Sequence, residues 1–288
     1  MKARTFMRAL AREPFMAGVL ILFVLLCVLA FGAPLLFGDH ATAVDVTRRL
    51  RAPSWLGDDG GVLGTDQLGR PLWIRLAEGL RTTLLVGLLA VLVGAVTGVT
   101  AGLAAGFYGR WVDAVIMRIA DVQMSFPALL FAMTIVAIAG GGMIVIVVVL
   151  GLNSWMIYAR LTRSVVLRFR GNDFVIATVN LGATPRRVMF GHLLPNALPQ
   201  VVSMATLEAA RIMLAEATLS FLGFGVQPPA ISIGTILGEG RDYLTNQWWV
   251  STFAGVLLAL TVLCANLLGN WAQRVSDPLT KYEMDTTA

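Results

Sequence analysis

Three ionisable residues within one apolar stretch are the first candidates for chemistry. Glu208, Arg211 and Glu216 lie between residues 199 and 222, a segment that is otherwise mostly apolar. Glu208 and Arg211 are three residues apart, so on a helix they share one face and can form an ion pair. Ionisable groups within a membrane-spanning helix are energetically costly unless they face a water-filled path or a partner helix. A functional path and an internal pair that only fixes helix packing are both consistent with this pattern.

The other reactive residues do not combine into a catalytic or metal-binding set. The only lysines are Lys2 and Lys281, and neither follows a glycine as the lysine of a phosphate-binding P-loop does. The histidines and cysteines also lack companions at metal-ligand or disulfide spacing: His40, His192, Cys27 and Cys264. We therefore expect no catalytic residue, no metal and no cofactor in this chain.

The composition excludes most water-soluble folds. Hydrophobic residues make up 57% of the 288 positions and charged residues 14%, and the mean hydropathy is +0.77. A soluble domain needs roughly 25% charged residues for its surface, so the surplus apolar surface must face a lipid bilayer. The pI of about 9.8 does not indicate a nucleic-acid partner, because the arginines are scattered between apolar runs.

Six charge-poor stretches are long enough to cross a bilayer, which takes about 20 mostly apolar helical residues. We expect an all-α, polytopic membrane protein with six transmembrane helices, at 15–37, 82–107, 112–139, 143–163, 199–222 and 249–272. Pro127 is expected to kink the third helix, and the glycines at 140–142 to form a tight turn before the fourth. The first stretch exceeds the ~7–15 apolar residues of a cleaved signal peptide, so we expect it to remain as an anchor.

The basic residues favour an orientation with both termini in the cytoplasm. In that orientation 14 Lys and Arg residues lie in cytoplasmic segments and 7 in external ones, which with Arg211 accounts for all 22. This bias agrees with the positive-inside rule. Arg75 and Arg81 run against it, because they flank the second span on the external side.

Two other classes of membrane protein would use the same ionisable residues. A secondary transporter would use Glu208 and Glu216 as proton or ion sites near the midplane. An intramembrane enzyme would use Asp121 or Glu216 as an acid or base. Neither class explains a pair of capped helices in the cytoplasm, which is the next feature of the sequence.

The loop between the fourth and fifth spans contains two helix starts. Asn172 or Asp173 is a plausible N-cap and Gly182 a plausible C-terminal stop. Thr184 and Pro185 then restart a helix, which we expect to cover 184–192 and to be prevented by Pro195 from continuing into the membrane. A helix this short is marginal in water and must dock, either on its own membrane domain or in a groove of a cytoplasmic partner. The residues that it is expected to expose are Val188, Met189 and Phe190.

Glycines recur at every fourth position of the second span. Gly94, Gly98, Gly102 and Gly106 make one face of this helix small, so that another backbone can approach it closely. Ordinary helix packing is the favoured interpretation, and a hinge or pore-lining helix is the alternative.

Several motifs resemble one family over nearly the whole chain. Gly182, separated by nine residues from HLLP at 192–195, resembles the EAA loop of permease subunits of ATP-binding-cassette importers. GTDQLGR at 64–70 resembles the GTDxxGRD signature of the dipeptide, oligopeptide and nickel permeases. EATLSFLGFGVQPP at 216–229 and DPL at 277–279 resemble two further motifs of that family. The greatest similarity is to its second permease subunit, called C, of a peptide importer.

The resemblance implies a type I ABC importer permease fold and a set of partners. These are a homologous second permease, two cytoplasmic ATPases that bind ATP and Mg, and an external solute-binding protein. It also implies that the helix at 184–192 fits a cleft of an ATPase, within an EAA-like loop at 164–198. The implied ATPase-coupling residues are Ala177, Gly182, Ala183, Thr184, Pro185, Arg186, Arg187, Val188, Phe190, Leu194 and Pro195.

The sequence departs from the family pattern in two places. Ile176 stands where the loop usually has glutamate, so the salt bridge of that glutamate cannot form. Ile233 stands where a tryptophan usually follows Gln-Pro-Pro. We divide the chain into residues 1–81, with the first helix and an external loop at 38–81 that contacts the binding protein, and a permease core at 82–288. Di- or oligopeptides are the expected cargo, with nickel or haem-like cargo as the alternative.

Overall fold

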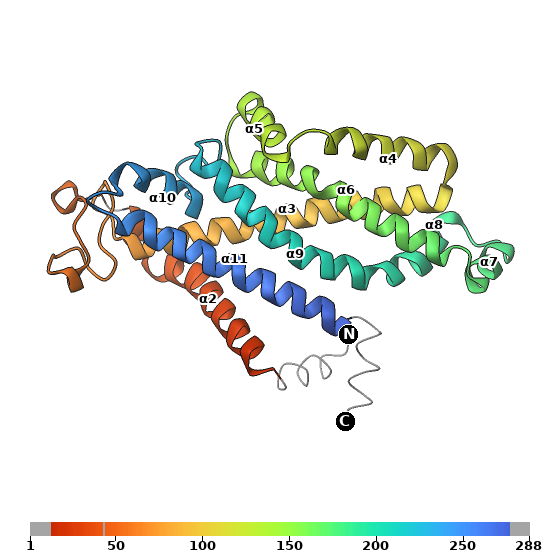
Figure 1. Ribbon diagram of the computed structural model, residues 1–288, viewed down its shortest axis with the longest axis horizontal. Helices are drawn as coiled ribbons and strands as arrows, with labels where there is room; N and C mark the ends of the chain where they lie inside the picture. Colours follow the sequence, from red (N-terminus) through yellow and green to blue (C-terminus); the bar gives the residue numbers. More distant parts are fainter. Residues whose placement is uncertain (1–12, 43, 277–288) are drawn as a thin grey trace.

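The computed structural model describes residues 13–42 and 44–276, and these residues form helices joined by short loops (Figure 1). The helices are α2 (Pro14–Thr42), α3 (Leu72–Tyr108), α4 (Arg110–Met124), α5 (Ala128–Ala139), α6 (Met143–Phe169), α7 (Asp173–Asn180), α8 (Pro185–Val188), α9 (Leu194–Phe221), α10 (Ile233–Gly240) and α11 (Trp249–Ser276). A π-helix, Met189–Leu193, joins α8 to α9, and 3₁₀ turns lie at Val46–Arg48, Ser54–Leu56 and Arg241–Tyr243. The expected all-α fold is confirmed. The basic residues before position 13 and the motif at 277–279 lie outside the described residues.

The long helices run alongside one another, and most of their loops lie at two opposite ends, whereas the connection between α4 and α5 lies between these ends (Figure 1). Residues 44–71 and α10 lie at one end, called here the loop end. The turns of α7 and α8 lie at the other, called here the coupling end. The three larger clusters of buried apolar residues lie one near each end and one between them, and two smaller clusters also contribute to the interior of the described residues. Many large apolar side chains remain exposed on the outside, as a surface that faces lipid requires.

Four helices are long and apolar enough to cross a membrane: Pro14–Phe37, Leu72–Tyr108, Met143–Phe169 and Trp249–Val275. The pair α4 and α5 gives a fifth span if the two helices count as one, although they are bent by 89°. By length and composition, the described residues therefore contain four or five candidate spans and not the expected six. The expected fifth span is α9, which has 28 residues but contains Glu208, Arg211 and Glu216.

Two of the predicted boundaries are corrected. The third span is not one kinked helix over 112–139, because the chain leaves the helical path at Ser125–Pro127 and turns sharply. Pro127 has an extended backbone (ψ 123°) and no N–H, so it cannot continue the hydrogen bonding of α4. The second span begins at Leu72, ten residues before the predicted start, since Arg75, Glu78 and Arg81 lie within the helix rather than before it. The division of the chain at residue 81 stays a prediction.

The glycine face of α3 packs against α6, which confirms the packing interpretation. A Cβ atom added at Gly98 would lie 2.2 Å from the carbonyl oxygen of Trp155, and one added at Gly102 would lie 2.4 Å from that of Ala159. α3 packs more extensively on α6 than on any other helix. Only residues without a side chain allow two backbones to come this close.

We expect Gly98→Ala to destabilise the protein. The added methyl group overlaps the backbone of α6, and such overpacking costs about 1–3 kcal/mol. The measurement is the thermal unfolding midpoint of the protein in detergent, which should fall by several degrees. Gly18→Ala is the matched control, because a Cβ at Gly18 of α2 would have nothing within 4 Å. Equal midpoints for the two variants would contradict close packing at Gly98.

Candidate functional site

The coupling end begins with α7, and its ends agree with the sequence prediction. Asn172 is the N-cap residue of α7 by its extended backbone, although its side chain makes no capping bond. Gly182 follows the helix with φ +83°. The N–H of Gly182 donates to the carbonyl of Val179 (2.9 Å) and that of Ala183 to Thr178 (3.2 Å), so the last carbonyls of α7 are satisfied by this left-handed turn.

The second helix starts where expected but does not end where expected. Thr184 caps it, its hydroxyl oxygen accepting from the N–H of Arg187 (3.4 Å), and Pro185 occupies the first turn. The expectation that Pro195 stops this helix is wrong. The backbone continues through the π-helix into α9 and ends only at Phe221.

The π-helix explains how the chain passes a proline without breaking. Pro195 has no N–H, so it cannot donate to the carbonyl four residues earlier. The N–H of Leu194 instead donates to the carbonyl of Met189, five residues back. The side-chain amide of Asn196 also donates to the carbonyl of His192 (2.7 Å). Single π turns of this kind are frequent at functional sites.

One side of this segment packs against other helices of the same chain, and its other side is exposed. Val188, Met189 and Leu193 are buried against α3, α6 and α9, so the expectation that Val188 and Met189 are exposed is wrong. Phe190 is exposed as expected, with 51% of its surface accessible. The side chains of Ala177, Thr184, Pro185, Arg186, Arg187 and Pro195 are also exposed, and those of Ala183 and Leu194 are half-buried.

Further exposed apolar side chains lie near Phe190, on α7 and directly after it. They are Phe174, Ile176, Val179 and Leu181, and we call these four residues together with Phe190 the coupling surface. The rings of Phe174 and His192 are 6.4 Å apart, which places α7 next to the π-helix. Four of these residues were absent from the candidates derived from the sequence. Helical spacing could not have grouped them, because Ile176 and Val179 lie on the opposite side of α7 from Phe174 and Leu181 follows the end of the helix.

The three ionisable residues of α9 do not form one site. Arg211 lies within 2.9 Å of the Glu208 carboxylate, as the spacing predicted. The Glu208 side chain is buried (4% exposed), whereas 55% of the Arg211 side chain is accessible. Glu216 lies two turns further along α9 and is fully buried. The hydroxyls of Thr83 (3.0 Å) and Ser220 (2.6 Å) donate to its two oxygens, which is an arrangement that joins α9 to α3.

Asp121, a candidate acid or base of an intramembrane enzyme, is engaged in an ion pair, and so is Asp113 of the same helix. Asp121 pairs with Arg160 of α6 at 2.6 Å, and Asp113 pairs with Arg163, so both carboxylates tether α4 to α6. Within residues 13–42 and 44–276, no three His, Cys, Asp or Glu side chains come close enough together to hold a metal ion.

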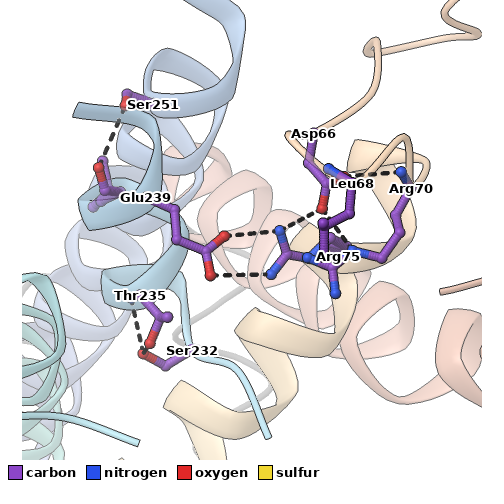
Figure 2. A network of polar contacts seen from close by, with 9 residues as sticks. Asp66, Leu68, Arg70, Arg75, Ser232, Thr235, Glu239 and Ser251 are labelled. Atoms are coloured by element: carbon purple, nitrogen blue, oxygen red, sulfur yellow. Dashed lines mark hydrogen bonds and ion pairs between the residues drawn. The ribbon is translucent and has the colours of Figure 1, made fainter. Parts of the chain in front are cut away.

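The loop end contains a cluster of four charged residues that the sequence analysis missed (Figure 2). We call Asp66, Arg70, Arg75 and Glu239 the loop-end cluster. Arg75 of α3 lies within 2.6 Å of Asp66 and 2.9 Å of Glu239 of α10, and Arg70 lies within 2.7 Å of Asp66. The side chains of Asp66 and Arg75 are almost fully buried. The sequence alone gave no reason to pair Arg75 with a residue 164 positions away.

Residues 44–71 are also held together by their own polar contacts. The N–H groups of Asp59 and Ala52 and the Arg51 guanidinium lower the pKa of Asp58. The hydroxyl of Thr47 lowers the pKa of Asp45 in the same way. Because both carboxylates are stabilised as anions, their contribution to the loop fold is present at neutral pH and is lost as the pH falls through their lowered pKa values.

Comparison with known proteins finds relatives that are permease proteins of transport systems. The di/tripeptide transport system permease protein DppC of Pseudomonas aeruginosa (strain UCBPP-PA14) is 40% identical over 236 residues, which cover 81% of this chain and 77% of that protein. The dipeptide transport system permease protein DppC of Alkalihalophilus pseudofirmus is 35% identical, with 91% and 85% covered. The glutathione transport system permease protein GsiD of Pectobacterium atrosepticum is 35% identical, with 96% and 91% covered.

A solved structure of similar fold is that of the MetNI methionine ABC transporter in inward-facing conformations. The two chains superpose with a TM-score of 0.58 at 23% identity, over 72% of this chain and 98% of that one. This likeness confirms the expected type I ABC importer permease fold. Residues 98–282 match the family described as the inner membrane component of binding-protein-dependent transport systems. With that match and relatives at least 35% identical across most of its length, the chain belongs to this family of multi-pass membrane permeases.

Proposed function

We propose that this chain forms one half of the translocation pathway of an ATP-driven importer for small peptides. The cargo is proposed because the relatives are named for dipeptides, di- and tripeptides and glutathione, which share a peptide backbone. None of these three is named for nickel or haem, so the alternative cargo is not favoured. An ion-coupled transporter is not favoured either, because Glu216 is enclosed by hydroxyl donors of its own chain.

The proposed assembly contains a homologous second permease, two ATP-binding subunits and an external solute-binding protein. In it the coupling end lies in the cytoplasm, together with both termini, and the loop end faces the binding protein. The excess of basic residues in the segments assigned to the cytoplasm supports this orientation. The ATP-binding subunits bind ATP and Mg and hydrolyse the ATP, since neither lysine of this chain follows a glycine as the P-loop lysine does.

The continuous helix from Pro185 to Phe221 is the observation that carries the mechanism. Its 37 residues span about 55 Å, at 1.5 Å per residue. A force applied at Phe190 when the ATPases close is transmitted along this helix without passing through a loop. The helix carries Arg211 and Glu216 past α3, so its movement changes the path between the two permeases and gives alternating access.

The first test of the function is peptide uptake by proteoliposomes that contain this chain with its partner subunits. We expect uptake of a labelled dipeptide to require ATP and the binding protein, and to be unaffected by dissipating ion gradients with ionophores. Uptake that continues without ATP, driven by an imposed proton or sodium gradient, would contradict the proposal and favour a secondary transporter.

The coupling surface gives a second prediction. Phe190→Asp places a charge on an exposed apolar position, and we expect ATP hydrolysis to continue while peptide uptake falls at least tenfold. Gly182→Val should have the same effect, because a β-branched residue at φ +83° costs about 1–3 kcal/mol of backbone strain and displaces the turn. The ratio of peptide imported to ATP hydrolysed is the quantity to measure.

Two control variants accompany this test. Phe190→Leu keeps the apolar contact, and Gly171→Val adds the same side chain at a neighbouring glycine with open space around it. Both should transport normally. If Phe190→Asp and Gly182→Val retain the wild-type ratio, the coupling surface does not contact the ATPases.

Arg211 gives a third prediction, because its guanidinium is accessible while its partner Glu208 is not. If Arg211 lines the path, Arg211→Gln lowers uptake of a dipeptide roughly tenfold, about 1.4 kcal/mol of barrier, and leaves the assembly intact. Arg241→Gln, at an exposed arginine of the loop end, is the control and should be neutral. Co-purification of the subunits is measured alongside uptake. Loss of assembly in Arg211→Gln would show instead that the residue serves helix packing.

A further inference from the structure

The loop-end cluster joins three segments that are distant in the sequence (Figure 2). Arg75 is the shared member. Its Nη1 atom donates to Asp66 Oδ2 (2.6 Å) and to Glu239 Oε2 (2.9 Å), and its Nη2 atom lies 3.5 Å from Glu239 Oε1. One guanidinium on α3 therefore holds residues 44–71 through Asp66 and α10 through Glu239. With Arg70 included, the cluster has two positive and two negative groups and no net charge.

The two carboxylates of the cluster have different surroundings. Asp66 accepts from the backbone N–H groups of Leu68 (2.8 Å) and Arg70 (2.9 Å) as well as from the Arg70 side chain. These contacts lie within the loop, so Asp66 sets the loop's own shape. Glu239 makes its hydrogen bonds and ion pairs with Arg75, and 28% of its side chain is exposed. Glu239 thus attaches a loop that is already folded to a separate helix.

α10 is in turn fixed to the far end of α9. A Cβ atom at Gly234 would lie 2.3 Å from the carbonyl oxygen of Ala217, so the two helices touch through their backbones. The N–H of Ile233 faces the hydroxyl of Thr83 (3.4 Å), which itself donates to Glu216 of α9. A displacement of α10 therefore acts directly on α9. The other end of α9 is continuous with the π-helix that carries Phe190 of the coupling surface.

We propose that Arg75 and Glu239 are positioning residues that make residues 44–71 and α10 one mechanical unit. Through this unit, docking of the external binding protein on the loop is transmitted to α9 and from there to the ATPases. The proposal rests on the proposed function, because it requires the loop end to face the binding protein. The shape of the loop, which Asp66 maintains, determines how tightly the binding protein docks. The Glu239–Arg75 contact determines how strongly docking stimulates ATP hydrolysis.

The test measures ATP hydrolysis by the complete assembly in lipid nanodiscs while peptide-loaded binding protein is titrated. Each titration gives two values: the maximal stimulation relative to the variant's own basal rate, and the half-saturating concentration of binding protein. Glu239→Gln keeps the size of the side chain and removes its charge. We expect its maximal stimulation to fall at least fivefold, with a half-saturating concentration within twofold of wild type.

Three further variants separate transmission from a general loss of structure. Asp66→Asn should raise the half-saturating concentration at least fivefold, because an amide NH2 group replaces the oxygen that accepts from the Arg70 side chain and the negative charge is lost. Glu239→Asp, which keeps the charge on a shorter side chain, should give a maximal stimulation between those of Glu239→Gln and wild type. Asp242→Asn has the same charge change at an exposed neighbour that pairs with Arg241, and should match wild type in both values.

Two outcomes would overturn the inference in distinguishable ways. If wild type is stimulated and Glu239→Gln reaches the same maximum, or changes only the half-saturating concentration, the cluster shapes the docking surface and transmits nothing. If wild type itself is not stimulated by the binding protein, the proposed function fails and the inference fails with it. Amide hydrogen exchange over residues 45–70 should be the same in Glu239→Gln and wild type; faster exchange there would show that Glu239 folds the loop and would contradict its assigned role.

Discussion

A helical backbone that continues from α8 through the π-helix to the end of α9 connects the two ends of the molecule. Inside a bilayer each backbone N–H and C=O must find a partner within the protein, since lipid offers none. Pro195 and Pro199 each remove one donor from this helix, and the five-residue bond from Leu194 to Met189 lets the helix continue past Pro195. Without that local change the chain would need a loop at the membrane surface, and α9 would not be continuous with the segment that follows Gly182.

The ionisable residues show how an apolar protein accommodates charge. Glu216 is enclosed by hydroxyl donors, and Glu208 is paired with an arginine of its own helix. At the loop end, Arg75 neutralises two carboxylates from different segments. A buried ion pair gives little net stability, because the cost of removing charges from water offsets their attraction. Such pairs specify geometry instead, since breaking one leaves an uncompensated charge.

Local sequence signals predicted much of this arrangement. Thr184 with Pro185, and the glycine at 182, marked helix ends correctly because caps and positive-φ turns depend on neighbouring residues. The small face of α3 also indicated close packing correctly. The π-helix was missed because a proline normally stops a helix, and only packing of Val188, Met189 and Leu193 in the interior explains the continuation. The loop-end cluster was missed because Asp66 and Glu239 are brought together by tertiary folding alone.

Helix α9 also constrains the length of the chain. Each residue of an α-helix turns the backbone by about 100°, so one residue added or removed rotates everything beyond it around the axis. In α9 between Leu194 and Glu208, such a change would rotate the buried Val188 and the exposed Phe190 around the helix axis relative to Glu208. Between Leu194 and Glu208, homologous chains should therefore tolerate exchanges of one apolar residue for another far better than the gain or loss of a single position.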